Sequence, residues 1–415
     1  MSQGHRPHRG ASGDASSASH AAHLRALNID RVLRIAVDRS GAFTRAELIQ
    51  ETGLSAPTVG SVTTDLIRKG VLTDLGTAPS RGGRRPGLME FNARHGFVGG
   101  LDLGPTRTRL AVGDLRGHPL ITRIVATPSQ VDPPTLVARL TATLHSMMDE
   151  AGVEPDQLLA IVAGAPGPVD LSSGTVLYAP NLDHWDHVPL RAILQERFAG
   201  AAIVIENDVN LALLGEHWRG AAQDHDTCAF LFVGTGIGSA ILIDGGLHHG
   251  HHYMAGEIGA MLMAPQYLGR DFGSRGCLET LAGMSGLRDR WDGSHAHAPD
   301  RWFGSLMDAY RCGDERAVRL VDETAALLGM AAAHLGAIVD PSVLILGGSM
   351  FAERGPMVDA VRRVVGCIAR TPFEVVVSAL GKEAPLAGCM LVGAREAQRV
   401  LRHQLRGTIR RRAIQ

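Results

Sequence analysis

The chain has 415 residues, of which 45% are hydrophobic and 20% are charged, so it has enough apolar material for two or three packed domains. Its apolar runs are short and interrupted by Gly, Asp or Arg, and residues 1–20 lack the apolar core of a signal peptide. Composition therefore argues against a membrane or secreted protein. It predicts a cytoplasmic protein whose five cysteines, without a Cys-x-x-Cys pair, are free thiols.

The formal net charge is −1, but positive charge is concentrated near the N-terminus. Residues 1–97 carry a net charge of +5, which leaves −6 on the rest of the chain. A positive segment on an otherwise acidic protein is typical of a DNA-binding domain, because such a domain contacts phosphates. We therefore expect any nucleic-acid contact to come from the N-terminal part.

The N-terminal segment begins with residues 1–22, which are rich in Ser, Ala, Gly and His and are expected to form a disordered arm. A first helix is predicted from Asn28 onward, because apolar residues recur there at helical spacing. A second helix is predicted from about Thr44 to Thr52. The Thr44 hydroxyl can cap this helix, and Glu47 completes a capping box.

A third helix is predicted to begin after Ser55, which can cap it. Its apolar residues form an inward stripe that consists of Val59, Val62, Leu66 and Ile67. Its outward residues are small and polar, namely Ala56, Thr58, Gly60, Ser61 and Thr64. Such a face can lie in a major groove, which predicts a helix-turn-helix; a trihelical protein-interaction module is the alternative. The DNA contacts predicted in these helices are Arg45, Ser55, Thr58 and Ser61.

Two predicted strands, Val71–Leu75 and Gly87–Phe91, form a hairpin with a Gly- and Pro-rich tip, so residues 23–92 make a winged helix-turn-helix. The tip carries Arg81, Arg84 and Arg85. Guanidinium groups suit phosphates and narrow minor grooves, so these three arginines are predicted DNA contacts. A solvated loop without a partner is the alternative.

From Phe97 onward, strand-like runs alternate with helical segments, and glycine-rich turns fall at the strand ends. A strand, an Asp-x-Gly-x-Thr turn and a second strand can hold a phosphate, with the Asp directed toward a metal-bound nucleotide. The candidate nucleotide-binding residues are Asp102, Gly104 and Thr106 in the first turn, Gly234, Thr235, Gly236 and Gly238 in the second, and Gly347 and Gly348 in the third. Three turns in this order resemble the actin-like ATPase (ribonuclease H-like) α/β fold, in which two lobes clamp a nucleotide. The alternative is that the glycines only close hairpins.

Further motifs follow one another along the chain, namely Ala165–Asp170, Asn181-Leu182-x-x-Trp185, Glu206–Asn210 with Gly215-Glu216, Ala255–Gly259 and Gly276–Glu279. With these motifs, the chain resembles the ROK family of repressors, open reading frames and sugar kinases, in its repressor branch. The resemblance implies a sugar kinase-like domain at 97–400, with lobe one at about 97–220, lobe two at about 221–385 and a final helix that returns to lobe one. Residues 401–415 are expected to form a basic tail.

The same resemblance implies a sugar site. In family kinases, the pair that matches Asn207-Asp208 binds sugar hydroxyls, and the Asp is the general base that deprotonates the attacking hydroxyl. The glutamates that match Glu257 and Glu279 also bind the sugar. Carboxylates and amides suit polyols because each oxygen accepts from adjacent hydroxyls. A catalytic role for Asp208 is implied only if the chain is an active kinase.

The chain departs from the family at its zinc site. The positions of the family's His and three Cys ligands hold Ala260, Arg270, Phe272 and Cys277. A lone thiolate cannot supply the tetrahedral set that zinc requires, so we expect no structural zinc and no resident metal. The histidines within His248–His252 leave a substitute metal site as an alternative.

A second departure is Pro105, where family kinases usually have Gly, because proline has no N–H to offer a phosphate. We therefore expect a transcriptional regulator, most simply a repressor, that binds a double-stranded DNA operator as a homodimer or homotetramer. A sugar or sugar derivative in the cleft is expected to control it, with no membrane contact. The alternatives are an ATP- and Mg-dependent sugar kinase with an accessory DNA-binding domain, and a pseudo-kinase scaffold that binds partners through the basic tail.

Overall fold

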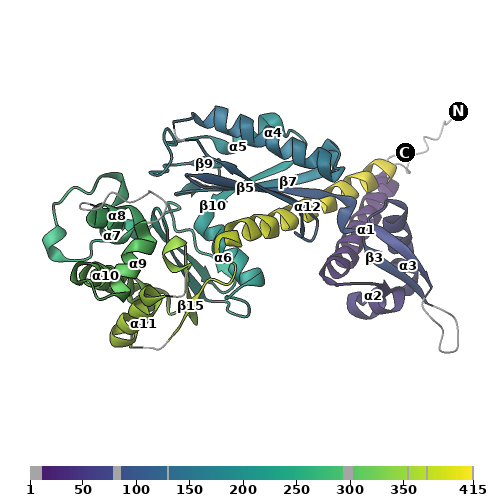
Figure 1. Ribbon diagram of the computed structural model, residues 1–415. Helices are drawn as coiled ribbons and strands as arrows, with labels where there is room; N and C mark the ends of the chain where they lie inside the picture. Colours follow the sequence, from purple (N-terminus) through teal and green to yellow (C-terminus); the bar gives the residue numbers. More distant parts are fainter. Residues whose placement is uncertain are drawn as a thin grey trace, which may run out of the picture.

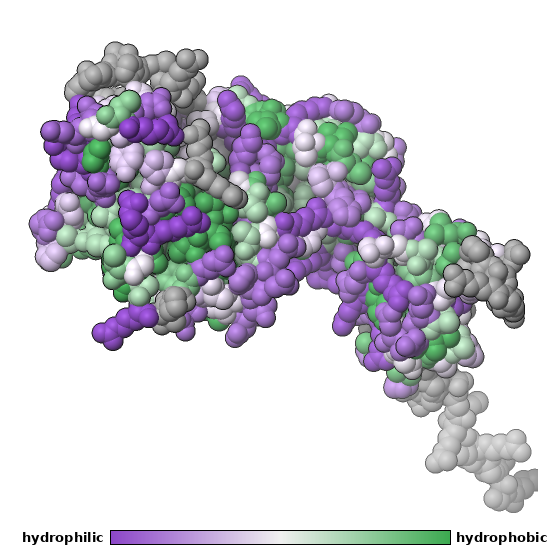
Figure 2. All heavy atoms as spheres, turned by 60° about the horizontal axis from the view of Figure 1, so that its bottom comes forward, coloured by the Kyte–Doolittle hydropathy of each residue, from purple (hydrophilic) through white to green (hydrophobic). Residues whose placement is uncertain are grey.

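The computed structural model describes residues 12–77, 86–128, 130–292, 302–352, 355–370 and 373–413. These residues form a small N-terminal domain and two larger lobes, each lobe built on a five-stranded sheet (Figure 1). The last helix, α12 (Ala384–Ala413), begins between the lobes and runs along lobe one to the N-terminal domain. Figure 2 shows the N-terminal domain projecting from the lobes across a narrow junction.

The N-terminal domain is a winged helix-turn-helix with a three-stranded sheet in the order β1-β3-β2. Its elements are α1 (Ser12–Asp38), β1 (Phe43–Thr44), α2 (Arg45–Thr52), α3 (Ala56–Arg68), β2 (Leu72–Thr77) and β3 (Gly87–Phe91). The predicted capping box is confirmed, because the Thr44 hydroxyl accepts from the Glu47 N–H while the Glu47 carboxylate accepts from the Thr44 N–H. The Ser55 hydroxyl accepts from the Thr58 N–H and caps α3. Gly53 ends α2 with a φ of 66°, a left-handed conformation that glycine adopts without strain.

Two features of this domain differ from the expectation. Helix α1 begins at Ser12, so the prediction of a disordered arm through residue 22 is wrong from Ser12 onward. The physical reason is that an Ala-rich stretch extends a helix that is already nucleated at little cost, even when it buries few apolar groups. The two-residue strand β1 is too short to leave a pattern in the sequence. Residues 1–11 and the hairpin-tip residues Arg81, Arg84 and Arg85 lie outside the described part of the chain.

Lobe one contains a mixed sheet in the order β10-β7-β4-β5-β6, in which β7 and β10 run parallel to β4. Its elements are β4 (Phe97–Leu103), β5 (Arg107–Asp114), β6 (Pro119–Ala126), α4 (Pro133–Ala151), β7 (Leu158–Ala165), β8 (Val169–Asp170), β9 (Thr175–Val176), α5 (Leu190–Arg197), β10 (Ala202–Asn207) and α6 (Asp208–Arg219). Alternate residues of β4 face opposite layers. Leu101 and Leu103 pack in the core beneath α4, whereas Val98 packs with α12. Gly100 also faces α12, where an added Cβ would lie 2.5 Å from the Met390 side chain.

Lobe two contains a second mixed sheet, in the order β13-β12-β11-β14-β15. Its elements are β11 (Cys228–Val233), β12 (Ile237–Ile243), β13 (Gly246–Leu247), α7 (Cys277–Ala282), α8 (Met284–Asp292), α9 (Trp302–Arg311), α10 (Glu315–Val339), β14 (Val343–Gly347), α11 (Pro356–Ile368) and β15 (Glu374–Val377). Helices α7 to α11 share a core with one face of this sheet. Helix α6 packs against the other face and also contacts β7 and β10, so it lies between the two lobes (Figure 1).

Helix α12 joins the lobes to the N-terminal domain. It packs along α6 and the lobe-one sheet and then contacts α1. Leu401 and Leu405 are buried in one core with Val32 and Leu33 of α1, and Arg406 forms an ion pair with Asp30. The predicted boundary between domain and basic tail at residue 401 is wrong, because α12 continues through it and buries Leu401 and Leu405. Across the described ranges, no helix combines the length and apolarity needed to cross a membrane.

Candidate functional site

The start of α6 places the predicted Asn-Asp pair between the lobes. The Asn207 side chain caps α6, since its Oδ1 accepts from the N–H groups of Val209 and Asn210 at 2.9 and 3.0 Å. Its Nδ2 donates to the carbonyl oxygen of Gly167 at 2.9 Å, which ties the helix to the Pro-Gly-Pro loop of lobe one. The structure thus gives Asn207 a positioning role, and it places Asp208 at the first turn of the helix.

Asp208 belongs to a group of four carboxyl groups that come from both lobes. Burial and the nearby Asp102 raise the pKa of Asp208 to about 8, and Glu257 adds to this effect. Burial raises the pKa of Glu257 to about 7, with a further contribution from Glu279. Burial also raises the pKa of Asp102 to about 6, although the Arg109 guanidinium opposes the shift. The predicted sugar residues of lobe one and lobe two therefore lie in one crowded acidic site.

Glu279 is the best placed of these carboxyl groups to receive a hydrogen-bond donor. It is 7% exposed, and its Oε2 accepts from the backbone N–H of Ile237 at 2.9 Å. Its Oε1 is buried and has no hydrogen-bond partner in the described structure. Gly236 permits this approach, because a Cβ there would lie 2.9 Å from Glu279 Oε2 and 3.1 Å from Asn181 Nδ2. A buried oxygen without a donor is unfavourable, and a ligand hydroxyl would satisfy it.

The sequence did not predict that Tyr178 lies near the acidic site or that Glu206 contacts His249. Burial raises the pKa of Tyr178 to about 12, with contributions from Glu257 and Glu279, so its hydroxyl lies near both glutamates. Glu206 accepts from the Asn207 N–H at 2.8 Å, and its other oxygen is 2.9 Å from Nε2 of His249 in lobe two. Glu206 and His249 both lie in segments that the sequence singled out, but no motif indicated their contact or the place of Tyr178, because these segments are distant in the chain.

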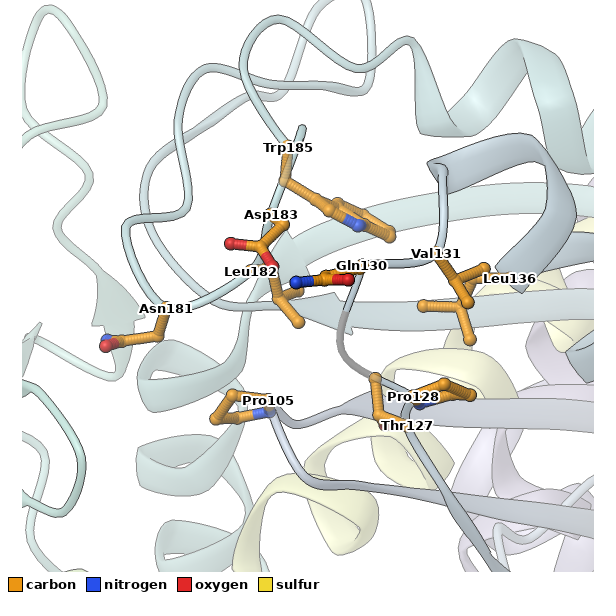
Figure 3. A pocket seen from close by; sticks show the side chains of 10 residues that line it. All are labelled: Pro105, Thr127, Pro128, Gln130, Val131, Leu136, Asn181, Leu182, Asp183 and Trp185. Carbon is orange, nitrogen blue, oxygen red and sulfur yellow. The ribbon is translucent and has the colours of Figure 1, made fainter.

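The first glycine turn is accompanied by a small cavity, which Figure 3 shows from close by. Its lining combines apolar groups such as Pro105 and Trp185 with the polar side chains of Gln130, Asn181 and Asp183. Trp185 is buried, and the loop that carries it continues from Tyr178. The motif residues Asn181 and Trp185 therefore line the same cavity in lobe one.

The glycine turns have packing reasons that do not require a nucleotide. A Cβ on Gly104 would lie 2.5 Å from the Arg107 carbonyl oxygen, and one on Gly347 would lie 2.2 Å from the Phe230 ring. Gly348 has a φ of 92°, and a Cβ there would lie 2.3 Å from the Val233 carbonyl oxygen. In the second turn, Gly234 donates its N–H to the Gly236 carbonyl, and Gly238 is the second residue of β12. Thr235, like Thr106 in the first turn, is exposed.

The residues present do not fit a magnesium-bound nucleotide at the first turn. Asp102, the residue expected to face the metal, is 3.3 Å from the guanidinium of Arg109 and is only 5% exposed. Pro105, the next-but-one residue after Leu103, has no N–H to donate to a phosphate.

The matched zinc positions likewise do not form a ligand set. Ala260 lies beside Gly276 and hence near the buried Cys277, whereas the Arg270 guanidinium lies 5.0 Å from the centre of the Phe272 ring. No group of three or more His, Cys, Asp or Glu side chains suited to a metal occurs within the part of the chain that the structure describes. In the upstream loop, the imidazole of His249 is hydrogen-bonded to Glu206.

The helix-turn-helix presents the predicted small polar face. Ser55, Ser61 and Thr64 are exposed, and Thr58 is partly exposed. Two of the predicted residues also make contacts within the domain. The Arg45 Nε donates to the Thr63 hydroxyl at 2.9 Å, which joins α2 to α3, and the Ser61 hydroxyl accepts from Arg25 of α1 at 3.3 Å.

Comparison with known proteins identifies both parts of this architecture. The family model described as ROK family matches residues 98–395. The xylose repressor of Caldicellulosiruptor bescii is 29% identical over 388 residues, which cover 88% of this chain and 95% of that protein. The glucokinase of Streptomyces coelicolor is 31% identical over 313 residues, which cover 71% of this chain and 96% of that protein. The repressor alignment is too long to lie in the two lobes alone, so it includes part of the N-terminal domain.

Solved structures agree with this division. A ROK family transcriptional regulator, described as a homologue of the E. coli MLC protein, superposes with a TM-score of 0.73 at 22% identity and covers 92% of this chain and 99% of that one. A ROK family glucokinase from Streptomyces griseus, in complex with glucose and AMPPNP, has a TM-score of 0.60 at 31% identity and covers 72% of this chain and 100% of that one. The two-lobed fold and the winged helix-turn-helix are those predicted from the sequence, and the chain belongs to the ROK family.

Proposed function

We propose that this chain is a transcriptional repressor that binds a double-stranded DNA operator and releases it when a sugar or sugar derivative binds between its lobes. The observation that carries the proposal is the single helix α12, which packs on lobe one and α6 at one end and on α1 of the helix-turn-helix at the other. A ligand that moves the lobes therefore acts on the DNA-binding domain through a packed connection.

The acidic site supports a polyol ligand. Its carboxyl groups hold raised pKa values because they are buried together, and Glu279 Oε1 has no donor. Sugar hydroxyls both donate and accept hydrogen bonds, so they can satisfy ionised and protonated carboxyl groups alike. Because relatives named xylose repressors align with more than four-fifths of the chain, xylose is the first sugar to test.

The helix-turn-helix supports DNA as the partner. The exposed face of α3 is small and polar, and the preceding helix carries Arg45 at its first position. Winged helices of this kind bind operators as symmetric pairs, so we expect a homodimer or homotetramer in solution. Light scattering after gel filtration measures that state directly.

A sugar kinase is the second candidate, favoured by the position of Asp208 at the start of α6 and by the match to glucokinases. Against it, burial raises the pKa of Asp208 to about 8, so the protonated form, which cannot act as a general base, predominates at neutral pH. The pairing of Asp102 with Arg109 also leaves the first turn poorly suited to a metal-bound nucleotide.

Two assays separate the candidates. Selection from random duplexes, followed by fluorescence anisotropy, is expected to yield a salt-sensitive preference for one operator sequence. A coupled ADP-release assay over xylose, glucose and amino sugars is expected to show no turnover. Steady ADP release with any of these sugars would support the kinase, and the absence of any preferred duplex would contradict the repressor.

A further inference from the structure

Arg109 and Asp102 face each other across the first glycine turn. They are directly opposed in the antiparallel ladder of β4 and β5, so their side chains leave the same face of the sheet. The Arg109 guanidinium lies 3.3 Å from the Asp102 carboxylate, and the two side chains are 18% and 7% exposed. The aspartate that a metal-bound nucleotide would need is therefore already paired with a cation of the chain itself.

A second carboxylate approaches Arg109 from another part of the fold. Glu383 ends the short 3-10 helix Gly381–Glu383, which joins lobe two to α12, and its Oε1 lies 3.8 Å from Arg109 Nε. That Nε is buried and makes no hydrogen bond. Arg109 thus lies between a carboxylate of lobe one and a carboxylate of the segment that leads into α12.

The fixed guanidinium makes this turn unfavourable for a divalent cation. A cation at Asp102 would lie close to Arg109, and like charges repel strongly where burial reduces solvent screening. If Arg109 moved aside, its largely buried guanidinium would keep only the more distant contact with Glu383. The positive charge of Arg109 therefore disfavours a metal ion at Asp102, whatever the glycines of the turn contribute.

We propose that Arg109 is a built-in cation that excludes a magnesium-bound nucleotide from the first turn, so that the cleft binds its sugar without a nucleotide. The inference rests on the proposed function for the identity of the sugar ligand, but the exclusion itself is a property of the turn. If Arg109 were only a structural link between β5 and the start of α12, its removal would leave the affinity for nucleotide unchanged.

The test measures the binding of AMPPNP with magnesium to the full chain by isothermal titration calorimetry. Arg109→Val removes the charge and introduces a residue that is common in β-strands. Arg109→Gln also removes the charge but keeps a side chain that can donate a hydrogen bond. Arg107→Ala is the matched control, because Arg107 is an exposed arginine on the same strand. We expect the wild type and Arg107→Ala to bind with a Kd weaker than ~1 mM, and both Arg109 variants to bind at least about tenfold more tightly.

The wild-type measurement can overturn the proposal by itself. It does so if the wild type binds the magnesium nucleotide with the tighter affinity that is expected only of the Arg109 variants. The proposal is also overturned if Arg109→Gln folds but shows no gain in nucleotide affinity. If Arg109→Val does not fold, the result for Arg109→Gln decides between the two outcomes. A gain in Arg109→Val alone would make side-chain bulk the cause and would contradict a charge mechanism. Operator binding is measured in parallel, so a chain that gains nucleotide affinity but binds no operator contradicts the proposed function and not this inference.

Discussion

The acidic site shows how single residues prepare the cleft for a ligand. Asp102, Asp208 and Glu257 all have pKa values raised by burial, and each of the last two is raised further by a neighbouring carboxyl group. Such crowding is unfavourable in the ligand-free protein, and hydroxyl donors would relieve it. A binding site of this kind lowers the stability of the ligand-free protein. The destabilisation that Asp208 causes can therefore be measured.

Asp208 should lower the free energy of unfolding as the pH rises. Its pKa is about 8 in the folded chain against the ordinary aspartate value of 3.8, so the folded protein retains a proton that the unfolded chain releases. Its contribution is therefore complete below about pH 4 and is lost as the pH rises toward 8. Asp208→Asn should stabilise the chain by roughly 1–3 kcal/mol at pH 8, and by less at pH 5.

Thermal unfolding of the wild type and the variant across pH 5–8.5 measures this difference. Asp149→Asn is the matched control, because Asp149 is an exposed residue of α4. A difference in melting temperature that is the same at both ends of the pH range would mean that Asp208 does not titrate as described.

At the scale of elements, local signals predicted the helix-turn-helix well and long-range contacts poorly. The capping box of α2, the Ser55 cap of α3 and Gly53 mark helix ends because they act within three or four residues. The start of α1 was misjudged because extending a helix that is already nucleated costs little. The boundary at residue 401 was misjudged because Leu401 and Leu405 of α12 are buried in one core with Val32 and Leu33 of α1. The motif residues Asp208, Glu257 and Glu279 lie together in the structure, whereas Tyr178, His249 and Arg109 reach this region only through tertiary structure.

The capping box of α2 gives a prediction at this scale. Thr44→Ala removes the hydroxyl that accepts from the Glu47 N–H, so it should lower the free energy of unfolding of the N-terminal domain by about 1 kcal/mol. Thr64→Ala, on the exposed face of α3, is the control and should change stability by less than about 0.5 kcal/mol. Chemical denaturation followed by circular dichroism compares the two, and equal losses would contradict the capping role.

For the whole molecule, the central feature is that α12 belongs to two domains at once. Residues of α12 share one core with the lobe-one sheet and with α1, so the orientation of the helix-turn-helix depends on the position of this helix. The junction with the lobes is narrow in Figure 2, and α12 crosses it. Coupling through α12 is therefore the simplest route from ligand to operator.

Leu405→Ala should weaken this coupling. Leu405 is 5% exposed, and its truncation should lower the stability of the junction by roughly 2–3 kcal/mol. We expect the variant to bind operator but to lose most of its response to sugar, as measured by fluorescence anisotropy. Arg399→Ala is the control, because Arg399 is exposed and pairs within the helix with Glu396. An unchanged sugar response in Leu405→Ala would show that the signal travels by another route.

The most direct test of the account is a titration of the operator complex with sugar, in the wild type and in Glu279→Gln. Saturating sugar is expected to weaken operator binding by the wild type at least about tenfold. Glu279→Gln should bind the operator normally but respond only at much higher sugar concentrations, because it loses the buried acceptor that has no partner in the free protein. If calorimetry shows that the wild type binds the sugar while its affinity for the operator stays the same, the lobes do not control the DNA-binding domain and the central claim is contradicted.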